Sequence, residues 1–383
     1  MDLGGHLNLV DHHCHGIQRA PLGPSAFGQL LTESDAPPPA GVSFWDSSLG
    51  FAVRRWCAPV LSLDSGVDAQ TYLEQRLALG RDADRLFLAQ GGLSALCIDD
   101  GFPADEVLTV PEMAELSGRR AFRIVRLEAV AEEVAKRGVS AEEFADAFAH
   151  ELATQCGDQA VVGLKSVIGY RHGLDFEAES PSPAAVKSCA ESWLQAAEPE
   201  SVPQLKDPVL LRHVLYTGAR LGGEMGLPLQ FHTGLGDTSL HLGRVDPLHL
   251  TDFIRQVQDC GTTVVLLHGY PFHRNASYLA HAYPHVYTDV GLSLNYVGRW
   301  AHKILSEVLE LAPFAKVLFS TDAYGLADLY YLGTVLFRRA MQSCCEQAVA
   351  SGDWADEDAR RVAQMVGSEN ALRIYRRLPP LGS

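Results

Sequence analysis

The sequence is poor in basic residues and in long apolar runs. Its 383 residues hold 31 lysines and arginines against 47 aspartates and glutamates, a formal net charge of −16. Such an acidic chain is poorly suited to nucleic acid or to an anionic membrane surface, so we expect neither as a partner. No apolar run approaches the roughly 20 residues that cross a bilayer, and the N-terminus does not resemble a signal peptide. We therefore expect a cytoplasmic protein.

Cysteines at the spacing of metal or redox motifs are also missing. The eight cysteines are scattered, and no C-x-x-C occurs. Without a secretion signal, they are expected to be reduced and mostly buried thiols. Apolar residues, in contrast, make up 47% of the chain, which is ample for a large core.

Short apolar runs alternate with longer helical patterns along the chain. The strands are predicted at residues 7–13, 93–99, 121–128, 160–166, 227–233, 262–268, 285–291 and 316–322. The clearest helices are predicted over residues 140–155, 208–226, 326–350 and 356–377. Eight strands separated by helices favour the α/β class and a (β/α)₈ TIM barrel, with a doubly wound sheet as the alternative.

The predicted strands are unevenly spaced. About eighty residues separate the first strand from the second, more than an ordinary connection needs. We interpret residues 17–90 as a large, partly helical insertion that covers the barrel mouth, with an Ala-Pro-rich tip near 36–41. A second insertion, residues 170–188, follows the fourth strand, and its His172 is assigned no direct role. Residues 1–383 then form a single barrel domain.

The first strand ends in the stretch NLVDHHCHG, residues 8–16. His13 and His15 are two positions apart, so on an extended strand both imidazoles project the same way, as a pair of metal ligands would. Cys14 should point to the opposite face, and His12 is interpreted as exposed or as a supporting residue. A polar N-terminal loop would explain this stretch equally well, so the other strand ends must decide.

Polar residues stop the apolar runs at several predicted strand ends. The active site of a TIM barrel lies at the C-terminal ends of its strands. One histidine there is commonly a simple hydrogen-bonding group, but several together indicate a metal site. Nitrogen and carboxylate ligands suit Zn²⁺, Mn²⁺ or Fe²⁺, with Zn²⁺ the default. The residues at these ends are His13, His15, Lys165, His232, His268 and Asp322.

A divalent cation at these residues would support hydrolysis. It would lower the pKa of a bound water to about 7 and polarise a carbonyl oxygen. Asp322 could bind the cation and accept the proton of the water, later passing it to a leaving amine. Arg171, with a planar fork that suits a carboxylate, is a candidate for substrate contact. Arg274 and Asp237 are further candidates, although either could be a surface charge or a loop cap.

Taken together, these motifs resemble the amidohydrolase superfamily, and within it the amidohydrolase-related (type 2) branch. The closest likeness is to the FluG/nodulin-type amidohydrolase domain, which some proteins carry fused to a glutamine-synthetase-like domain. The resemblance extends over most of residues 7–375 and is weakest in the 17–90 insertion. It rests on the stretches VDHHCHG, GLKSVIGYRHGLD, PLQFHTGLGD, VVLLHGYPFHRNASYLAHAYPHVYTDVGLS and KVLFSTDAYGLADLYYLG.

The resemblance implies a role for each residue at the strand ends. Members with one metal hold it on the first-strand histidine pair, the fifth-strand histidine and the eighth-strand aspartate, while the sixth-strand histidine hydrogen-bonds water or the substrate carbonyl. Members with two metals add a carboxylated lysine after the fourth strand. An uncarboxylated lysine could instead pair with a substrate carboxylate, and both possibilities remain open. The matching residues are His13, His15, Lys165, His232, His268 and Asp322.

The leading hypothesis is a metal-dependent hydrolase that cleaves a C–N bond of a small carboxylate-bearing amide, by attack of a metal-bound hydroxide. The likeness to domains fused with glutamine-synthetase-like modules suggests a γ-glutamyl amide. Two alternatives remain: a metal-dependent decarboxylase or sugar-acid isomerase of the same superfamily, and an inactive barrel that acts as a binding module. A small molecule is the expected partner, and the apolar helix start at 330–337 leaves a homo-oligomer open.

Overall fold

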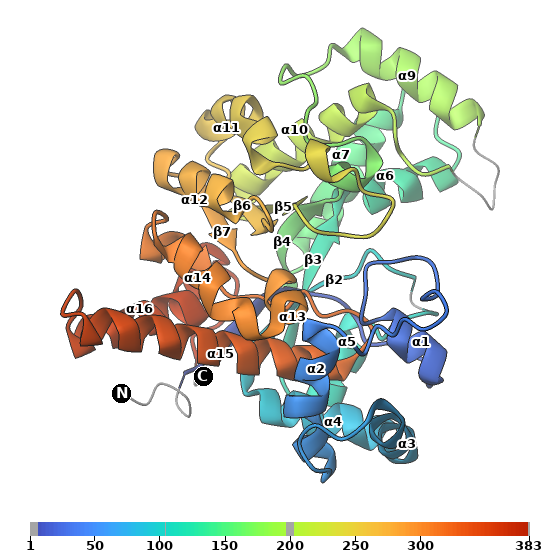
Figure 1. The fold of residues 1–383 in the computed structure, drawn as a ribbon. Coiled ribbons are helices and arrows are strands. Elements are labelled where there is room, and N and C mark those ends of the chain that lie inside the picture. The colour runs from blue at the N-terminus through green and yellow to red at the C-terminus, as the bar shows by residue number, and fades with distance from the viewer. Residues whose placement is uncertain (1–6, 104, 197–202, 382–383) are drawn as a thin grey trace.

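Eight parallel strands form one sheet in the computed structural model, which describes residues 7–103, 105–196 and 203–381 (Figure 1). Each strand pairs with the next along the chain. The chain after the last strand returns to the first, because the Asp322 amide donates to the His13 carbonyl at 3.1 Å. The sheet therefore closes into the predicted TIM barrel, and the doubly wound alternative is wrong. The strands are β1 (Leu9–Cys14), β2 (Leu93–Asp99), β3 (Arg120–Arg126), β4 (Val161–Ser166), β5 (Leu229–Thr233), β6 (Val264–His268), β7 (Val286–Asp289) and β8 (Val317–Leu318).

The predicted insertion after β1 is helical in part, as expected. It contains α1 (Pro24–Gln29), α2 (Ser48–Ala52), α3 (Ala69–Leu79) and α4 (Arg81–Gly91). In Figure 1 these elements lie at the lower right of the barrel, and α2 contacts the helix formed by Ser293–Val297. The remaining helices follow the strands in turn: α5 (Val110–Ser117), α6 (Leu127–Lys136), α7 (Phe144–Gly157), α8 (Ile168–Arg171), α9 (Pro183–Gln195), α10 (Pro208–Met225), α11 (Thr251–Val257), α12 (His273–Ala282), α13 (Ser293–Val297), α14 (Ala301–Leu309), α15 (Ala327–Ala350), α16 (Asp356–Gln364) and α17 (Asn370–Ile374).

Local hydrogen bonds explain where the predicted helices begin and end. The Asp207 carboxylate accepts from two backbone amides at the start of α10, and Gly226, at φ +67°, ends that helix. The helix predicted from Ser140 begins instead at Phe144, since Ser140 first forms a turn with Glu143. The helix predicted over 356–377 is divided into α16 and α17 by a π-helical turn at 365–369.

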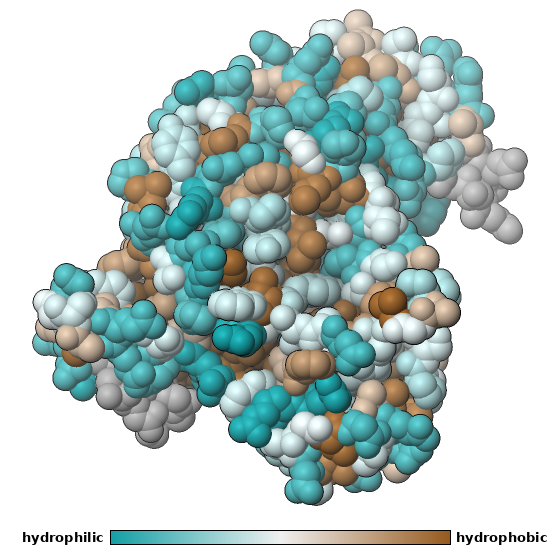
Figure 2. All heavy atoms as spheres, viewed as in Figure 1, coloured by the Kyte–Doolittle hydropathy of each residue, from teal (hydrophilic) through white to brown (hydrophobic). Residues whose placement is uncertain are grey.

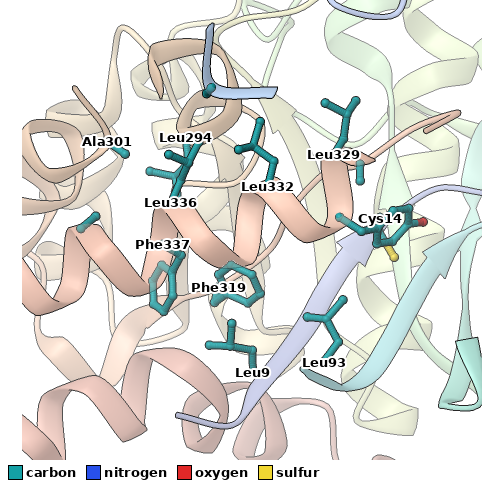
Figure 3. Close-up of a cluster of buried hydrophobic side chains, with 14 of the residues drawn as sticks. Leu9, Cys14, Leu93, Leu294, Ala301, Phe319, Leu329, Leu332, Leu336 and Phe337 are labelled. Carbon is teal, nitrogen blue, oxygen red and sulfur yellow. The ribbon is translucent and has the colours of Figure 1, made fainter. Parts of the chain in front are cut away.

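The outer core lies between the barrel and its helices. The long helix α15 packs its apolar face against the outside of β1 and the segment after β8 (Figure 3). The rings of Phe337 and Phe319 have their centroids 4.6 Å apart, and Leu9 lies beside them. Full burial of each such side chain stabilises the fold by about 1.5–3 kcal/mol. This packing fixes β1, which carries His13, and the segment after β8, which leads to Asp322.

The inner core fills the lower part of the barrel. Apolar side chains from several strands pack there with the C-terminal residues Ile374 and Tyr375. Because this interior is dry and closed, polar groups collect only above it, at the C-terminal ends of the strands. The inward-facing strand residues are Val10, Ala95, Cys97, Ile124, Val162, Val265, Leu267 and Leu318.

The surface carries mixed polarity. On the face shown in Figure 2, hydrophilic residues predominate toward the rim and hydrophobic residues gather near the middle. Within the described ranges, no helix combines the length and the apolar character that a membrane span requires.

Candidate metal centre

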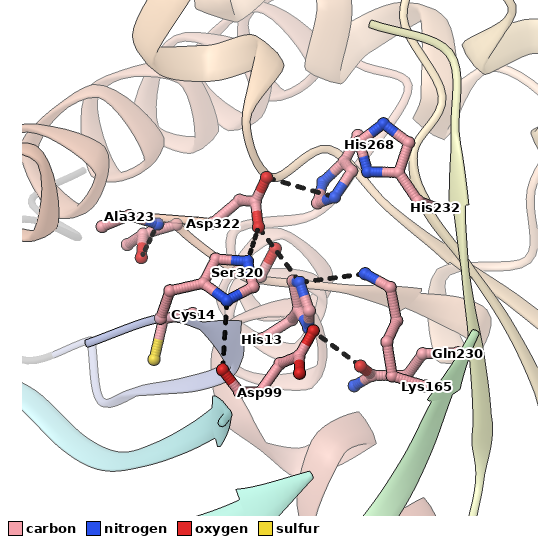
Figure 4. A network of polar contacts seen from close by, with 12 residues as sticks. His13, Cys14, Asp99, Lys165, Gln230, His232, His268, Ser320, Asp322 and Ala323 are labelled. Atoms are coloured by element: carbon pink, nitrogen blue, oxygen red, sulfur yellow. Dashed lines mark hydrogen bonds and ion pairs between the residues drawn. The ribbon is translucent and has the colours of Figure 1, made fainter. Parts of the chain in front are cut away.

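Three imidazoles converge on the carboxylate of Asp322 above the inner core (Figure 4). The Nε2 atoms of His13 and His15 lie 3.0 and 3.2 Å from Asp322 Oδ1. The Nε2 atom of His268 lies 3.2 Å from Asp322 Oδ2. The strand ends that the sequence singled out therefore meet at one place.

The backbone at these strand ends aims the side chains. Cys14 points away from the site into the outer core and contacts the Cys97 carbonyl, so His13 and His15 share the inner face as expected. His268 and Asp322 have φ angles of +70° and +49°. This left-handed conformation is disfavoured for side chains other than glycine and persists where surrounding contacts enforce it.

The hydrogen bonds of the histidines fix their tautomers. His13 Nδ1 lies 2.8 Å from the Gln230 side-chain oxygen, and His15 Nδ1 lies 3.2 Å from the Asp99 carbonyl. Since these oxygens can only accept, each Nδ1 carries the proton and each Nε2 is left unprotonated. His232 donates from Nε2 to the Leu235 carbonyl at 2.8 Å, so its Nδ1 is the unprotonated nitrogen.

The donor atoms that face each other fit a divalent cation. Both ring nitrogens of His268 and Oδ1 of Asp322 are buried without a hydrogen-bond partner. Buried polar atoms are almost always satisfied, so these unpartnered atoms fit a cation bound between them. Donor atoms of His13, His268 and Asp322 all lie within 4.8 Å of one another, as do those of His13, His15 and Asp99. His232 is outside both groups, although its ring centroid is 4.8 Å from that of His268.

The electrostatics of the site favour metal-ready protonation states. Burial, followed by the charge of Lys165, lowers the pKa of His13 to about 3. Burial also lowers the pKa of His232 and of His268. Burial alone would raise the pKa of Asp322, but His268 and His13 hold it well below its usual value. Burial thus favours the neutral forms of His13, His232 and His268, and the Asp322 carboxylate is held ionised, as metal ligation requires.

Lys165 lies beside the histidines on β4. Its side chain is buried, and its Nζ is 3.2 Å from His13 Nε2. Burial lowers the pKa of Lys165 to about 8, although the carboxylates of Asp99 and Asp322 raise it. Lys165 is therefore close to losing its charge at neutral pH.

A layer of buried polar residues beneath the centre was missed in the sequence. The Gln230 side-chain oxygen accepts a hydrogen bond from His13 Nδ1, and its Nε2 donates to the His12 carbonyl and to the Tyr375 hydroxyl. His12 bonds both Tyr375 and Asp289, which makes it a buried supporting residue. Two signals were available: Gln230 stands two residues before His232 on β5, and Asp289 ends β7.

Asp99 was also missed, at the end of β2. Its carboxylate is paired with Arg126 at 2.8 Å, and its backbone carbonyl orients His15. Burial would raise the pKa of Asp99, but Arg126 and His15 hold it below its usual value. Because the Arg126 pair occupies its carboxylate, Asp99 is better placed to orient a ligand than to be one.

A cavity of about 720 Å³ opens above the centre. Its walls include His15, Lys165, His232 and Asp322, together with residues 29–35 of the insertion. A volume of this order is typical of small-molecule sites. The insertion therefore contributes directly to the surface that a ligand would meet.

Two of the three residues expected to contact substrate line this cavity. Arg171 is paired with Glu132 at 3.2 Å, and its Nη1 is buried without a hydrogen-bond partner. Asp237 lines the cavity from the loop after β5. Arg274 does not line it.

The prediction for Arg274 is corrected by its place on α12. Its side chain is 60% exposed, and its guanidinium is paired with Glu307 and Glu310. These acidic partners draw the guanidinium to the surface, away from the cavity. His172, which was assigned no direct role, is half-buried beside Arg244.

Comparisons with known proteins agree with this geometry. Residues 106–377 match the family model described as amidohydrolase. The chain is 33% identical over 405 residues to Protein fluG of Emericella nidulans, an alignment that covers 96% of this chain and 45% of that protein. The chain thus spans less than half the length of this curated relative.

Two solved structures share the fold. A protein of Lactobacillus casei ATCC 334, provisionally described as a metal-dependent hydrolase, has 27% identity and a TM-score of 0.85, covering 98% of this chain and 97% of that one. Uronate isomerase of Thermotoga maritima has 13% identity and a TM-score of 0.66, covering 97% and 95%. The second likeness concerns the fold alone.

Proposed function

The chain belongs to the amidohydrolase family, and from that premise we propose that it is a metal-dependent hydrolase acting on a C–N bond. The proposed substrate is a small amide that carries a carboxylate, such as a γ-glutamyl amide. The observation that carries this proposal is the convergence of His13, His15 and His268 on Asp322.

The residues that would hold the cation are already in the required protonation state. His13 and His15 present unprotonated Nε2 atoms, and Asp322 presents an ionised carboxylate. His232, with a free Nδ1, completes a donor set that suits Zn²⁺ and also admits Mn²⁺ or Fe²⁺. When bound, the cation supplies Lewis acidity, which polarises a carbonyl oxygen and acidifies water.

Asp322 and His268 are the groups placed to move protons. During hydrolysis a water oxygen bonds to the amide carbon, the C–N bond breaks, and the nitrogen gains a proton. We assign that transfer to the Asp322 carboxylate, which takes the proton from water and returns it to the leaving amine. His268 has both ring nitrogens unpartnered, so its N–H is available to the substrate oxygen.

Cationic groups on the β4 side would receive the substrate carboxylate. Arg171 lines the cavity with an unpartnered Nη1, and Lys165 lies nearer the centre. Beside a bound dication, Lys165 must either lose its charge or turn toward an anion. Asp237 is proposed to contact the substrate from the loop after β5.

Product analysis of the metal-loaded protein tests the proposal. Amine release is measured from γ-glutamyl-p-nitroanilide and from a set of N-acyl amino acids. His232→Ala removes a proposed ligand of the cation and should lower the rate of amine release by at least about 10³-fold, within the range that one catalytic group contributes. His172→Ala should retain the wild-type rate. Release of CO₂ from an aromatic acid or isomerisation of a sugar acid, with no amine from any amide, contradicts hydrolysis and favours the alternative chemistries.

A further inference from the structure

The cavity above the metal centre has opposite charges on two sides. Arg171 follows β4, whereas Asn295 and Tyr296 belong to α13, which follows β7. In a barrel with sequential strand order, β4 and the β7–β8 connection lie across the mouth from each other. The metal centre lies between them, because its residues come from β1, β6 and the end of β8.

Glu33 supplies negative charge on the α13 side. It lies in the insertion after α1, lines the cavity, and shares a hydrogen bond with the Tyr296 hydroxyl. Burial, with the charges of Asp322 and Asp237, raises the pKa of Glu33 to about 7, although the hydrogen bond with Tyr296 lowers it. Among the described residues, no cation forms an ion pair with it. A carboxylate so placed would be stabilised by a positive group of a ligand.

Asn295 lies on the same side. Its side chain is buried and lines the cavity. Its Nδ2 donates to the Leu329 carbonyl at 3.3 Å, and its Oδ1 is enclosed near Gly333 of α15, out of reach of a ligand in the cavity. An ammonium has N–H donors and no acceptor, which matches the Glu33 carboxylate and the Tyr296 oxygen.

The opposite side presents donors. Arg171 Nη1 is buried without a hydrogen-bond partner. Lys206 lines the same cavity and is exposed. These two groups suit a carboxylate, and the guanidinium binds one in a fixed orientation.

We propose that Glu33 and Tyr296 form an ammonium subsite, and that the substrate is an amide with a carboxylate at its acyl end and a cationic group at its amine end. This inference rests on the proposed function, in which the acyl part carries the carboxylate. The carboxylate then lies toward Arg171, the amide bond lies over the metal centre, and the amine part carries a second ammonium toward Glu33. The leaving group is therefore a diamine or a similar amine with a distal cation.

A matched pair of substrates tests the subsite. The γ-glutamyl amides of 1,4-diaminobutane and of pentylamine differ by one ammonium in place of a methyl group. The wild-type protein should prefer the cationic amide by about tenfold to a hundredfold in kcat/KM, the range for a charge-assisted contact. Glu33→Gln should abolish this preference, and Tyr296→Phe, which retains the carboxylate but not its partner, should reduce it. Glu74→Gln, which removes an exposed glutamate of α3, should leave it unchanged.

Calorimetric binding of the same two amides keeps the inference separate from the proposed function. Tighter binding of the cationic amide, lost in Glu33→Gln, supports the subsite even if neither amide is hydrolysed, in which case the proposed function fails. Hydrolysis of both amides with equal kcat/KM and equal affinity overturns the subsite and leaves the proposed function standing. Equal affinity without hydrolysis overturns both.

Discussion

Gln230 determines which nitrogen of His13 faces the metal centre. Its side-chain oxygen accepts a hydrogen bond from His13 Nδ1 at 2.8 Å, so the nitrogen that faces Asp322, Nε2, is unprotonated. Gln230→Leu should therefore weaken metal affinity by about 10- to 100-fold, as expected when the partner of a ligating histidine is lost. Metal titration against a chelator of known affinity measures this effect. Gln70→Leu, on the surface of α3, is the control, and equal affinity in all three proteins would refute the role given to Gln230.

Glu33 makes stability depend on pH. The pKa of Glu33 is about 7 in the folded chain, chiefly because of burial, against an ordinary value of 4.5. The Glu33 carboxyl thus holds its proton more tightly in the folded state than in the unfolded state. Its contribution to the free energy of unfolding is fully present below pH 4.5 and is lost as pH rises through about 7. Tyr170, Tyr296, Asp35, Asp237 and Asp322 are the groups that interact with it.

The variant Glu33→Gln removes this dependence. Between pH 4.5 and pH 8, the free energy of unfolding of wild type should fall by about 2 kcal/mol more than that of Glu33→Gln. This figure is reduced for the partial exposure of the carboxyl. Urea unfolding at the two pH values provides the comparison, with Glu74→Gln as control. A difference between Glu33→Gln and wild type that is the same at both pH values would rule out the raised pKa.

Single residues differ in how far the sequence reveals them. His13, His15, His232, His268 and Asp322 could be predicted because each stops an apolar run at a strand end. Asp289 obeys the same rule at the end of β7, whereas Gln230 lies within β5, where the strand-end pattern gives no signal.

Loop residues carry no such signal. Glu33 and Asn295 reach the cavity from connecting segments whose sequence has no period. Their place depends on how the insertion folds over the barrel, which the sequence pattern does not specify. Arg274 follows β6 as a mouth residue would, but its acidic partners on the neighbouring helix were not visible in a strand-end pattern.

The elements of the insertion are tied to the barrel by a buried ion-pair network. Asp328, in the first turn of α15, is fully buried and receives hydrogen bonds from Tyr72 and from Arg76 on α3. Arg76 is also paired with Asp84 on α4. Asp328 therefore connects α15 to the two helices that precede β2.

Loss of the Asp328 charge should destabilise the whole chain. Asp328→Asn leaves Arg76 buried with one carboxylate fewer, and we expect a loss of about 3 kcal/mol, as for other broken buried pairs. Denaturant unfolding measures the loss. Asp358→Asn breaks an exposed pair with Arg361 and should change stability by less than about 0.5 kcal/mol. Similar losses of stability in both variants would show that the buried network stabilises the chain no more than an exposed ion pair does.

The strands and helices themselves were largely predictable, whereas their irregular ends were not. Apolar runs indicated all eight strands, but β8 spans only Val317–Leu318. Beyond it, the Thr321 amide bonds the Asp11 carboxylate at 2.9 Å instead of a strand backbone. Such a contact joins residues 310 positions apart, so no local pattern could reveal it.

At the scale of the whole molecule, the barrel closure and the metal centre depend on each other. The Asp322 amide bonds β1, while its carboxylate contacts histidines from β1 and β6. The inner core below, with Tyr375 at its top, supports Gln230 and His12. The fold thus brings residues that are distant in the chain to one candidate cation site.

Elemental analysis of the purified protein after dialysis tests this claim most directly. The wild-type protein and His172→Ala should each retain at least one divalent cation per chain, whereas Asp322→Ala and His13→Ala should retain less than a tenth as much. Wild-type protein without stoichiometric metal after reconstitution, or variants that keep the full wild-type content, would contradict the account.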